Sequence, residues 1–148
     1  LDQMTWILAF DGETSEADRR KLEALRRRVA RVKDPSLSAD TPPDSLPFGV
    51  HAAYWLDLRG YGAPAEAARL DLPILVLQGD RDYQVTGRDA ARWEAALAGH
   101  PLAAFRGFPG LNHLFIAGEG PSAPVEYETP GHVDEAVIEE IVRWMGMR

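Results

Sequence analysis

Cysteine is absent from this chain of 148 residues, so the sequence excludes a disulfide framework and a thiolate metal site and leaves the redox compartment undetermined. No apolar run approaches the roughly 18 residues of a membrane span. No basic segment leads into an apolar one at the start, so no signal peptide is visible. We therefore expect a soluble protein, and a cytoplasmic location is compatible with this composition.

Positive charge is also scarce, because 16 Lys and Arg face 23 Asp and Glu, for a formal charge of -7. Phosphate binding needs clustered cations, so no nucleic-acid partner is expected. The one basic run, residues 26–28, is interleaved with Leu25 and Val29, which indicates the solvated side of a helix, with a phosphate site as the alternative. The histidines lack H-x-H or H-E-x-x-H spacing, so a metal site is not expected. The carboxylate–imidazole–hydroxyl chemistry considered below requires neither a metal nor an organic cofactor.

The first part of the chain predicts helices around a proline-rich stretch. Ser15 and Asp18 resemble a capping box at the start of a helix over 15–33, and Asp34-Pro35 would end it. Apolar residues recur there at the spacing of one buried stripe: Leu22, Leu25, Val29 and Val32. Residues 34–47 hold four prolines and are expected to be a loop or an extended segment held on a surface. Helices are expected again over 50–58 and 64–70.

From residue 72 the pattern alternates between strand and helix. Residues 73–78 are a continuous apolar run, typical of a strand buried on both faces of a parallel sheet. A helix over 87–98, a strand over 102–108 and a helix over 133–145 follow, which predicts the α/β class. Two strands do not bury both helices, so we expect the sheet to continue in residues outside this chain or in a partner.

The last of these helices is expected to turn one side inward and the other to solvent. The inward set is Val137, Ile141 and Trp144 or Met145, and the solvated set is Glu135, Glu139 and Glu140.

Two residues that carry chemistry follow the two predicted strands. Asp82 comes just after the first strand, and His113 lies in the loop after the second. The carboxyl ends of parallel strands meet at one edge of a sheet, where α/β proteins bind their ligands. A carboxylate that holds an imidazole, which in turn takes a proton from a hydroxyl, is the device of acyl transfer. A turn aspartate and a surface histidine are the alternatives.

These segments resemble a known family. Residues 75–85, LVLQGDRDYQV, and residues 108–115, FPGLNHLF, are similar to the C-terminal part of α/β-hydrolase-fold serine esterases, in the dienelactone-hydrolase and acyl-peptidase-like branch. The resemblance covers about residues 70–148. It implies that residues 65–148 form the last strands and helices of the hydrolase sheet and that residues 1–64 form a helical lid. It assigns the triad acid to Asp82, leaves Asp80 as a turn residue, and places the triad histidine at His113.

One part of that device is missing from the sequence. The nucleophile elbow G-x-S-x-G occurs nowhere in the chain. Ser122 has glycines nearby, but prolines flank it and it follows His113, against the order Ser, acid, His. We therefore expect this chain to be inactive alone, with the serine supplied by an N-terminal half of the same enzyme or by another chain.

Aromatic residues of the expected lid are candidates for contact with substrate. Tyr54, Trp55 and Leu56 would line an acyl pocket or pack the lid onto the sheet. Phe115, two residues after His113, would face the same pocket or anchor its loop. Residues 118–130 are either a mobile flap or an ordered surface loop.

The expected function is a serine hydrolase of carboxylesterase type, with a small-molecule ester or acyl substrate. The alternative is a non-catalytic binding or assembly module that completes the sheet of a partner chain. A lyase on the same fold would use the same Asp and His and would also need the serine. The acyl group, the leaving group and the oligomeric state are not readable from this sequence.

Overall fold

The computed structural model describes residues 2–10 and 15–146, and the chain divides into two compact units, Leu1–Gly62 and Ala63–Arg148. Each unit is described by itself. Within the described residues, every helix is too short or too polar to cross a membrane.

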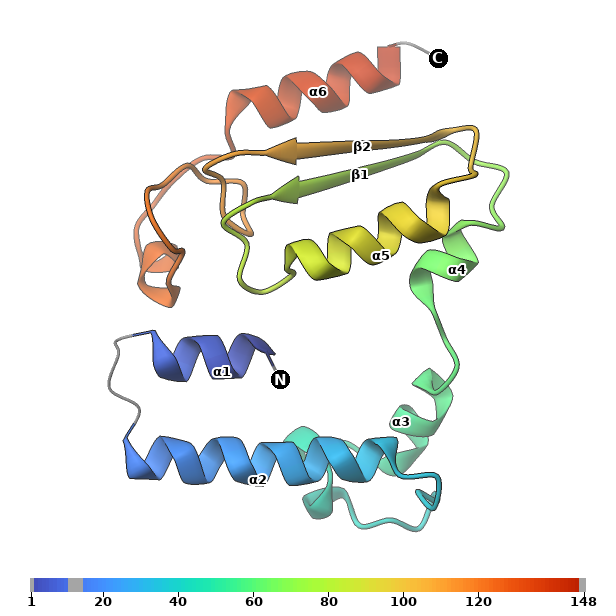
Figure 1. Ribbon diagram of the computed structural model, residues 1–148, viewed down its shortest axis with the longest axis vertical. Helices are drawn as coiled ribbons and strands as arrows, with labels where there is room; N and C mark the ends of the chain where they lie inside the picture. The colour runs from blue at the N-terminus through green and yellow to red at the C-terminus, as the bar shows by residue number, and fades with distance from the viewer. Residues whose placement is uncertain (1, 11–14, 147–148) are drawn as a thin grey trace. The chain divides into compact units, whose positions relative to one another are not determined.

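Among its described residues, the first unit contains three α-helices and two short 3-10 turns. These are α1 (Asp2–Ala9), α2 (Glu16–Lys33), η1 (Pro43–Ser45), η2 (Pro47–Gly49) and α3 (Ala52–Leu58) (Figure 1). The expected start of α2 is confirmed, because the Ser15 Oγ accepts a hydrogen bond from the Asp18 amide at 3.1 Å. α1 was not expected, since its eight mostly apolar residues do not show a helical period.

The proline-rich stretch supplies the core of this unit. Leu37 and Leu46 are buried together with Ala52, and Val32, Trp55 and Leu56 pack against them. Of the two expected descriptions of residues 34–47, the segment held on a surface fits these buried leucines better than a free loop.

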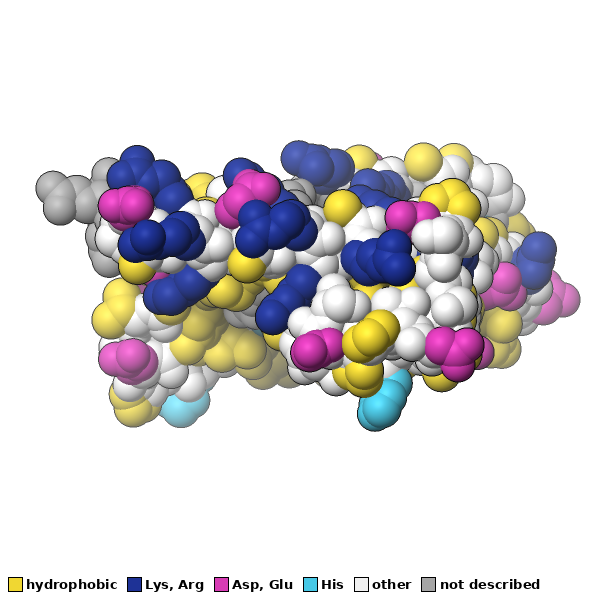
Figure 2. Space-filling view, turned by 90° about the horizontal axis from the view of Figure 1, so that it is seen from below, with side chains coloured by type: hydrophobic (Ala, Val, Ile, Leu, Met, Phe, Trp, Pro, Cys, Tyr) yellow, Lys and Arg dark blue, Asp and Glu magenta, His cyan; other side chains and the backbone are white. Residues whose placement is uncertain are grey.

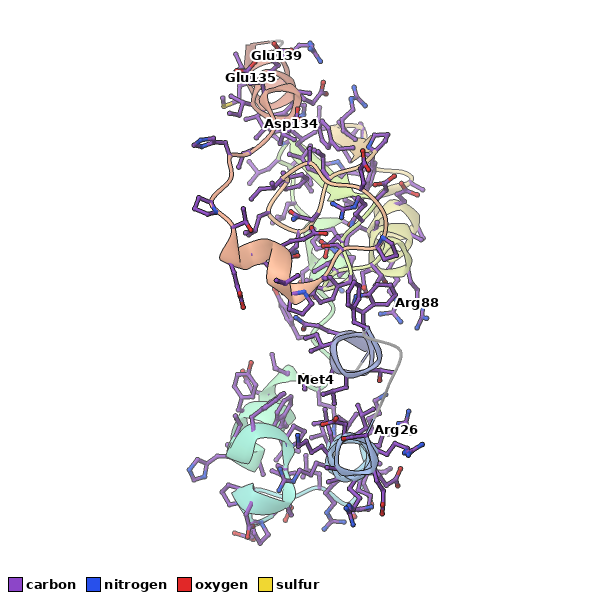
Figure 3. All side chains as sticks on the ribbon, turned by 90° about the vertical axis from the view of Figure 1, so that its left-hand side faces the viewer. Met4, Arg26, Arg88, Asp134, Glu135 and Glu139 are labelled. Atoms are coloured by element: carbon purple, nitrogen blue, oxygen red, sulfur yellow. The ribbon has the colours of Figure 1, made fainter. Side chains whose placement is uncertain are left out.

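The basic side of α2 faces solvent, as expected. Arg26, Arg27 and Arg28 are exposed, and Figure 2, which looks onto this helix, shows Lys and Arg side chains along it. Arg26 extends outward from α2 in Figure 3. Glu23 lies within 3.6 Å of Arg27, an i, i+4 pair of the kind that adds little stability at an exposed surface.

The second unit holds a two-stranded parallel sheet with its helices. Its elements are α4 (Ala63–Ala67), β1 (Ile74–Gly79), α5 (Gly87–Leu97), β2 (Ala103–Phe108), η3 (Pro124–Glu128) and α6 (Glu135–Gly146). β1 and β2 pair from Ile74 with Ala103 to Gly79 with Phe108, so both strands end at the same level. α5 and α6 lie on opposite sides of the strand pair (Figure 1), which agrees with the expected α/β class.

β1 is less buried than its apolar sequence predicts. Most of its residues are only half-buried, because β2 is the one strand that pairs with it in the described part of the chain. The expectation of a strand buried on both faces is therefore not met by the described residues.

The orientation of α6 differs in part from the expectation. Val137 is buried and Glu135 and Glu139 are exposed (Figure 3), as expected. Ile141 is exposed, although it was expected to face inward, and of the alternatives Trp144 and Met145 the first is half-buried and the second exposed. Glu140 is buried, although it was expected in solvent.

A cation on the neighbouring strand explains the buried Glu140. Arg106 of β2 donates from Nε to the Glu140 carboxylate at 2.7 Å, and Arg143 of α6 also donates to it. A buried carboxylate requires such partners. The spacing of apolar residues in α6 did not predict a partner for Glu140, because Arg106 lies 34 positions earlier in the chain.

Candidate functional site

The aspartate turn, residues 79–85, follows β1 and fixes the side chain of Asp82. The Asp82 Oδ1 accepts hydrogen bonds from the amides of Gln84 at 2.8 Å and Val85 at 2.9 Å. The Gln78 side-chain amide donates to the Val85 carbonyl at 2.9 Å and closes the turn. One carboxylate oxygen of Asp82 is thus held by the backbone and the other points away from the turn.

The histidine loop, residues 109–118, follows β2. An isolated bridge joins Leu111 to Ala117, and the Asn112 amide donates to the Ile116 carbonyl at 3.0 Å, so the loop doubles back on itself. Phe115 has φ of 56°, in the left-handed region that a bulky residue rarely adopts. Its ring packs edge-on against Phe108 at 5.9 Å, which helps to hold that conformation.

The turn and the loop bring Asp82 and His113 into contact. The His113 Nδ1 lies 2.8 Å from the Asp82 Oδ2. An ionised carboxylate only accepts hydrogen bonds, so Nδ1 is assigned the proton and Nε2 carries the lone pair. The Asp82 side chain is 8% exposed and that of His113 37% exposed. Nε2 has no hydrogen-bond partner within the described residues, so this arrangement can accept a proton from a hydroxyl.

Close backbone approach makes this contact possible. The Arg81 amide donates to the Leu111 carbonyl at 3.0 Å, and the Asp80 carboxylate accepts from the Gly110 amide at 2.7 Å. Asp80 is therefore the turn residue that the resemblance implied. A Cβ on Gly79 would lie 2.5 Å from the Leu111 carbonyl oxygen and 2.8 Å from that of Asn112. Only glycine fits at this end of β1.

A buried polar network lies beside this pair. Its members are Arg81, Asn112, Ser122 and Glu126, which we call the Glu126 network. The Glu126 Oε1 accepts from Arg81 at 2.5 Å, and its Oε2 accepts from Asn112 and from Ser122, each at 3.1 Å. Asn112 and Ser122 are each 1% exposed. Such a network is stable only when its members find partners.

The Glu126 carboxyl is held in its charged form. Burial by itself would raise the pKa of this group, but the hydrogen bonds that it accepts, first from Asn112 and then from Arg81, hold the pKa below its ordinary value of 4.5. In the same region, burial first and then the neighbouring Tyr127 and Asp82 raise the pKa of the Tyr83 phenol, which stays neutral.

Sequence reasoning missed most of this network. Arg81 lies inside the recognised turn and Glu126 in the polar segment 118–130, 45 positions later, and no spacing rule joins the two. Asn112 is buried and accepts on Oδ1 from the Leu114 and Ile116 amides, so it holds the histidine loop. The Glu119 and Gly120 carbonyls accept from Arg81, so the ordered-loop description of this segment fits better than a flap.

The remaining predicted site residues fall into both units. Trp55 and Leu56 pack against the core of the first unit, and Tyr54 is 54% exposed with its ring edge-on to Trp55. Trp55 also lines a hollow of about 570 Å³ within that unit. Phe115 belongs to the histidine loop of the second unit. Ser122 donates to Glu126.

No group of three or more His, Cys, Asp or Glu side chains is placed to hold a metal ion within residues 2–10 and 15–146. The Asp82–His113 pair lies at the carboxyl edge of the small parallel sheet.

Comparison with known proteins finds an esterase. The chain is 47% identical to Esterase EstD of Thermotoga maritima over 106 residues, which are 72% of this chain and 26% of that esterase. The chain thus spans about a quarter of the length of the relative that it matches. No protein-family model matches the chain, and no solved structure matches it. The chain is related in sequence to an esterase.

The close approach at Gly79 gives a first prediction. Gly79→Ala is expected to lower the free energy of unfolding by about 1–3 kcal/mol, because the new Cβ meets two backbone carbonyls that cannot rotate away. Urea unfolding followed by circular dichroism measures this. Gly107→Ala is the matched control in β2, where a Cβ meets nothing within 4 Å. Equal losses in both variants would contradict the steric explanation.

The lowered pKa of Glu126 gives a second prediction. Folding depresses this pKa, so the stabilisation is fully present above about pH 4.5 and is lost as the pH falls through the folded-state value. The stability difference between wild type and Glu126→Gln should therefore shrink on acidification. Urea unfolding between about pH 7 and about pH 3.5 checks this.

The exposed neighbour Glu128→Gln is the control for that series and should lower the free energy of unfolding at about pH 7 far less than Glu126→Gln does. A difference between wild type and Glu126→Gln that stays constant over the whole pH range would show that the charge of Glu126 does not contribute.

Proposed function

We propose that this chain supplies the acid and the base of a serine hydrolase that cleaves an ester or acyl bond. The observation that carries the proposal is the 2.8 Å hydrogen bond between His113 Nδ1 and Asp82 Oδ2. The sequence relationship to an esterase supports the same reaction class.

In the proposed reaction the two residues have separate roles. Asp82 holds the imidazole in the tautomer with the proton on Nδ1 and stabilises the imidazolium that forms. His113 Nε2 takes the proton of a serine hydroxyl, and the same proton then goes to the leaving group. Water then takes the place of the serine hydroxyl, and the same proton transfers through His113 release the carboxylic acid from the serine. The sequence contains no G-x-S-x-G, so the proposal assigns the serine to residues outside this chain.

The proposed hydrolase fold gives the two units different tasks. Residues 65–148 would form the C-terminal strands and helices of the sheet, and residues 1–64 would form a lid. The hollow lined by Trp55 has the size of a small-molecule pocket and supports a substrate contact for this residue. Tyr54, Leu56 and Phe115 remain proposed substrate contacts.

The roles of Asp82 and His113 can be tested in an enzyme that joins this chain to a segment with the serine elbow. With a short-chain nitrophenyl ester, Asp82→Asn should lower kcat by about 10⁴-fold, because the amide favours the wrong tautomer. His113→Ala should lower it at least as far. The chain alone should leave the ester intact.

Two matched variants serve as controls for that assay. Asp80→Asn keeps an acceptor for the Gly110 amide, and His132→Ala changes an exposed histidine, so both should retain activity. Full activity in His113→Ala would end the hydrolase proposal.

A second candidate function is an assembly module, and one observation favours it. α6 exposes four apolar side chains, Ile138, Ile141, Val142 and Met145. Contiguous exposed apolar surface marks an interaction site, and the described sheet has only two strands.

The native mass of the purified chain tests this second candidate. Association, with itself or with a chain that carries the missing strands, is expected because it would cover the apolar side of α6. Sedimentation velocity measures the mass, and Ile138→Lys with Val142→Lys should weaken association. A stable, soluble monomer at high concentration would contradict the assembly function.

A further inference from the structure

The residues that immediately precede Asp82 and His113 send their side chains to one carboxylate. Arg81 Nη2 donates to the Glu126 Oε1 at 2.5 Å, and Asn112 Nδ2 donates to its Oε2 at 3.1 Å. We propose that Glu126 is a positioning residue that sets the separation of Asp82 and His113 by bridging the positions next to them. This inference rests on the proposed function of the pair.

The first arm of the bridge is rigid. The Arg81 side chain is 8% exposed, and its Nε donates to the Gly120 carbonyl at 2.6 Å. A Cβ on Gly118 would lie 2.2 Å from the Arg81 Nη1, so the guanidinium fills a space that only glycine leaves open. The guanidinium therefore holds Glu126 at a fixed place relative to the aspartate turn.

The second arm is equally constrained. The Asn112 Oδ1 accepts from the amides of Leu114 at 3.0 Å and Ile116 at 3.1 Å, on the far side of His113 in the loop. Backbone amides donate only to an oxygen, so these two bonds identify the Asn112 side-chain oxygen, and the side-chain nitrogen has to point to Glu126. Any rotation of Asn112 would carry the backbone of His113 with it.

A glutamate suits this bridge and its nearest analogues do not. A carboxylate accepts on both oxygens, whereas glutamine has one acceptor and would turn an NH₂ group toward a donor. Aspartate keeps the charge but is shorter by one methylene, so it does not reach both arms. The two substitutions remove the bridge in different ways, one by charge and the other by length.

Glu140 provides a matched control within the same unit. Its side chain is 8% exposed, against 27% for Glu126, and it accepts from two arginines, Arg106 and Arg143, which lie outside both the aspartate turn and the histidine loop. Glu140→Gln therefore perturbs a buried ion pair of the same kind without touching the proposed bridge.

The test is NMR of the His113 Nδ1 proton in the full chain, which needs no activity. Wild type should give a low-field signal with slow solvent exchange. Glu126→Gln and Glu126→Asp should shift the signal upfield and speed exchange by about tenfold or more, while Glu140→Gln keeps both near wild type. Glu126→Asp keeps the negative charge, so the His113 Nδ1 signal can still be measured in that variant if Glu126→Gln is unstable. Backbone amide spectra check the fold of each variant.

Two results would overturn the inference: a wild-type signal in both Glu126 variants, or an equal change in Glu140→Gln. This outcome is separate from that of the hydrolase proposal. If His113→Ala stays active in the serine-bearing enzyme while the Glu126 variants lose the Nδ1 signal, the catalytic role fails and the positioning role stands. If His113→Ala is inactive and the Glu126 variants keep the signal, the catalytic role of His113 stands and the positioning role of Glu126 fails.

Discussion

The parallel pairing of β1 with β2 is the constraint on which the rest of the second unit depends. Gly79 pairs with Phe108, so both strands end at the same level and release their following segments at one edge. The aspartate turn and the histidine loop begin there, and their side chains meet because the strands are neighbours and run the same way. A shift of one strand by one residue would turn its side chains to the opposite face of the sheet and separate the pair.

Proximity at that edge is not sufficient to orient an imidazole. The approach is close enough that Gly79 leaves no room for a Cβ, and the Asp82 carboxylate is held by two backbone amides. The Glu126 network adds a buried set of charge-assisted hydrogen bonds behind the pair. Such bonds are short and directional, so they restrict angles that apolar packing leaves free.

This chain contains some parts of the proposed catalytic device and lacks another. Asp82 and His113 are in contact within the second unit, and the sequence contains no G-x-S-x-G motif. Its exposed apolar residues on α6 and its half-buried β1 are features of a sheet with uncovered sides. The described residues thus combine an Asp–His contact with a two-stranded sheet that is only partly covered.

Local patterns in the sequence determined the elements of this protein. The capping residue Ser15, the apolar run before Gly79 and the turn after it act within a few positions, so the start of α2, the strand β1 and the place of Asp82 could be predicted. Only the tertiary structure decided the rest: the burial of Glu140 by Arg106, the core role of the proline-rich stretch, and the joining of Arg81 to Glu126. These contacts link residues up to 45 positions apart. A buried charge is stable only beside its partner, and no local period records where that partner folds.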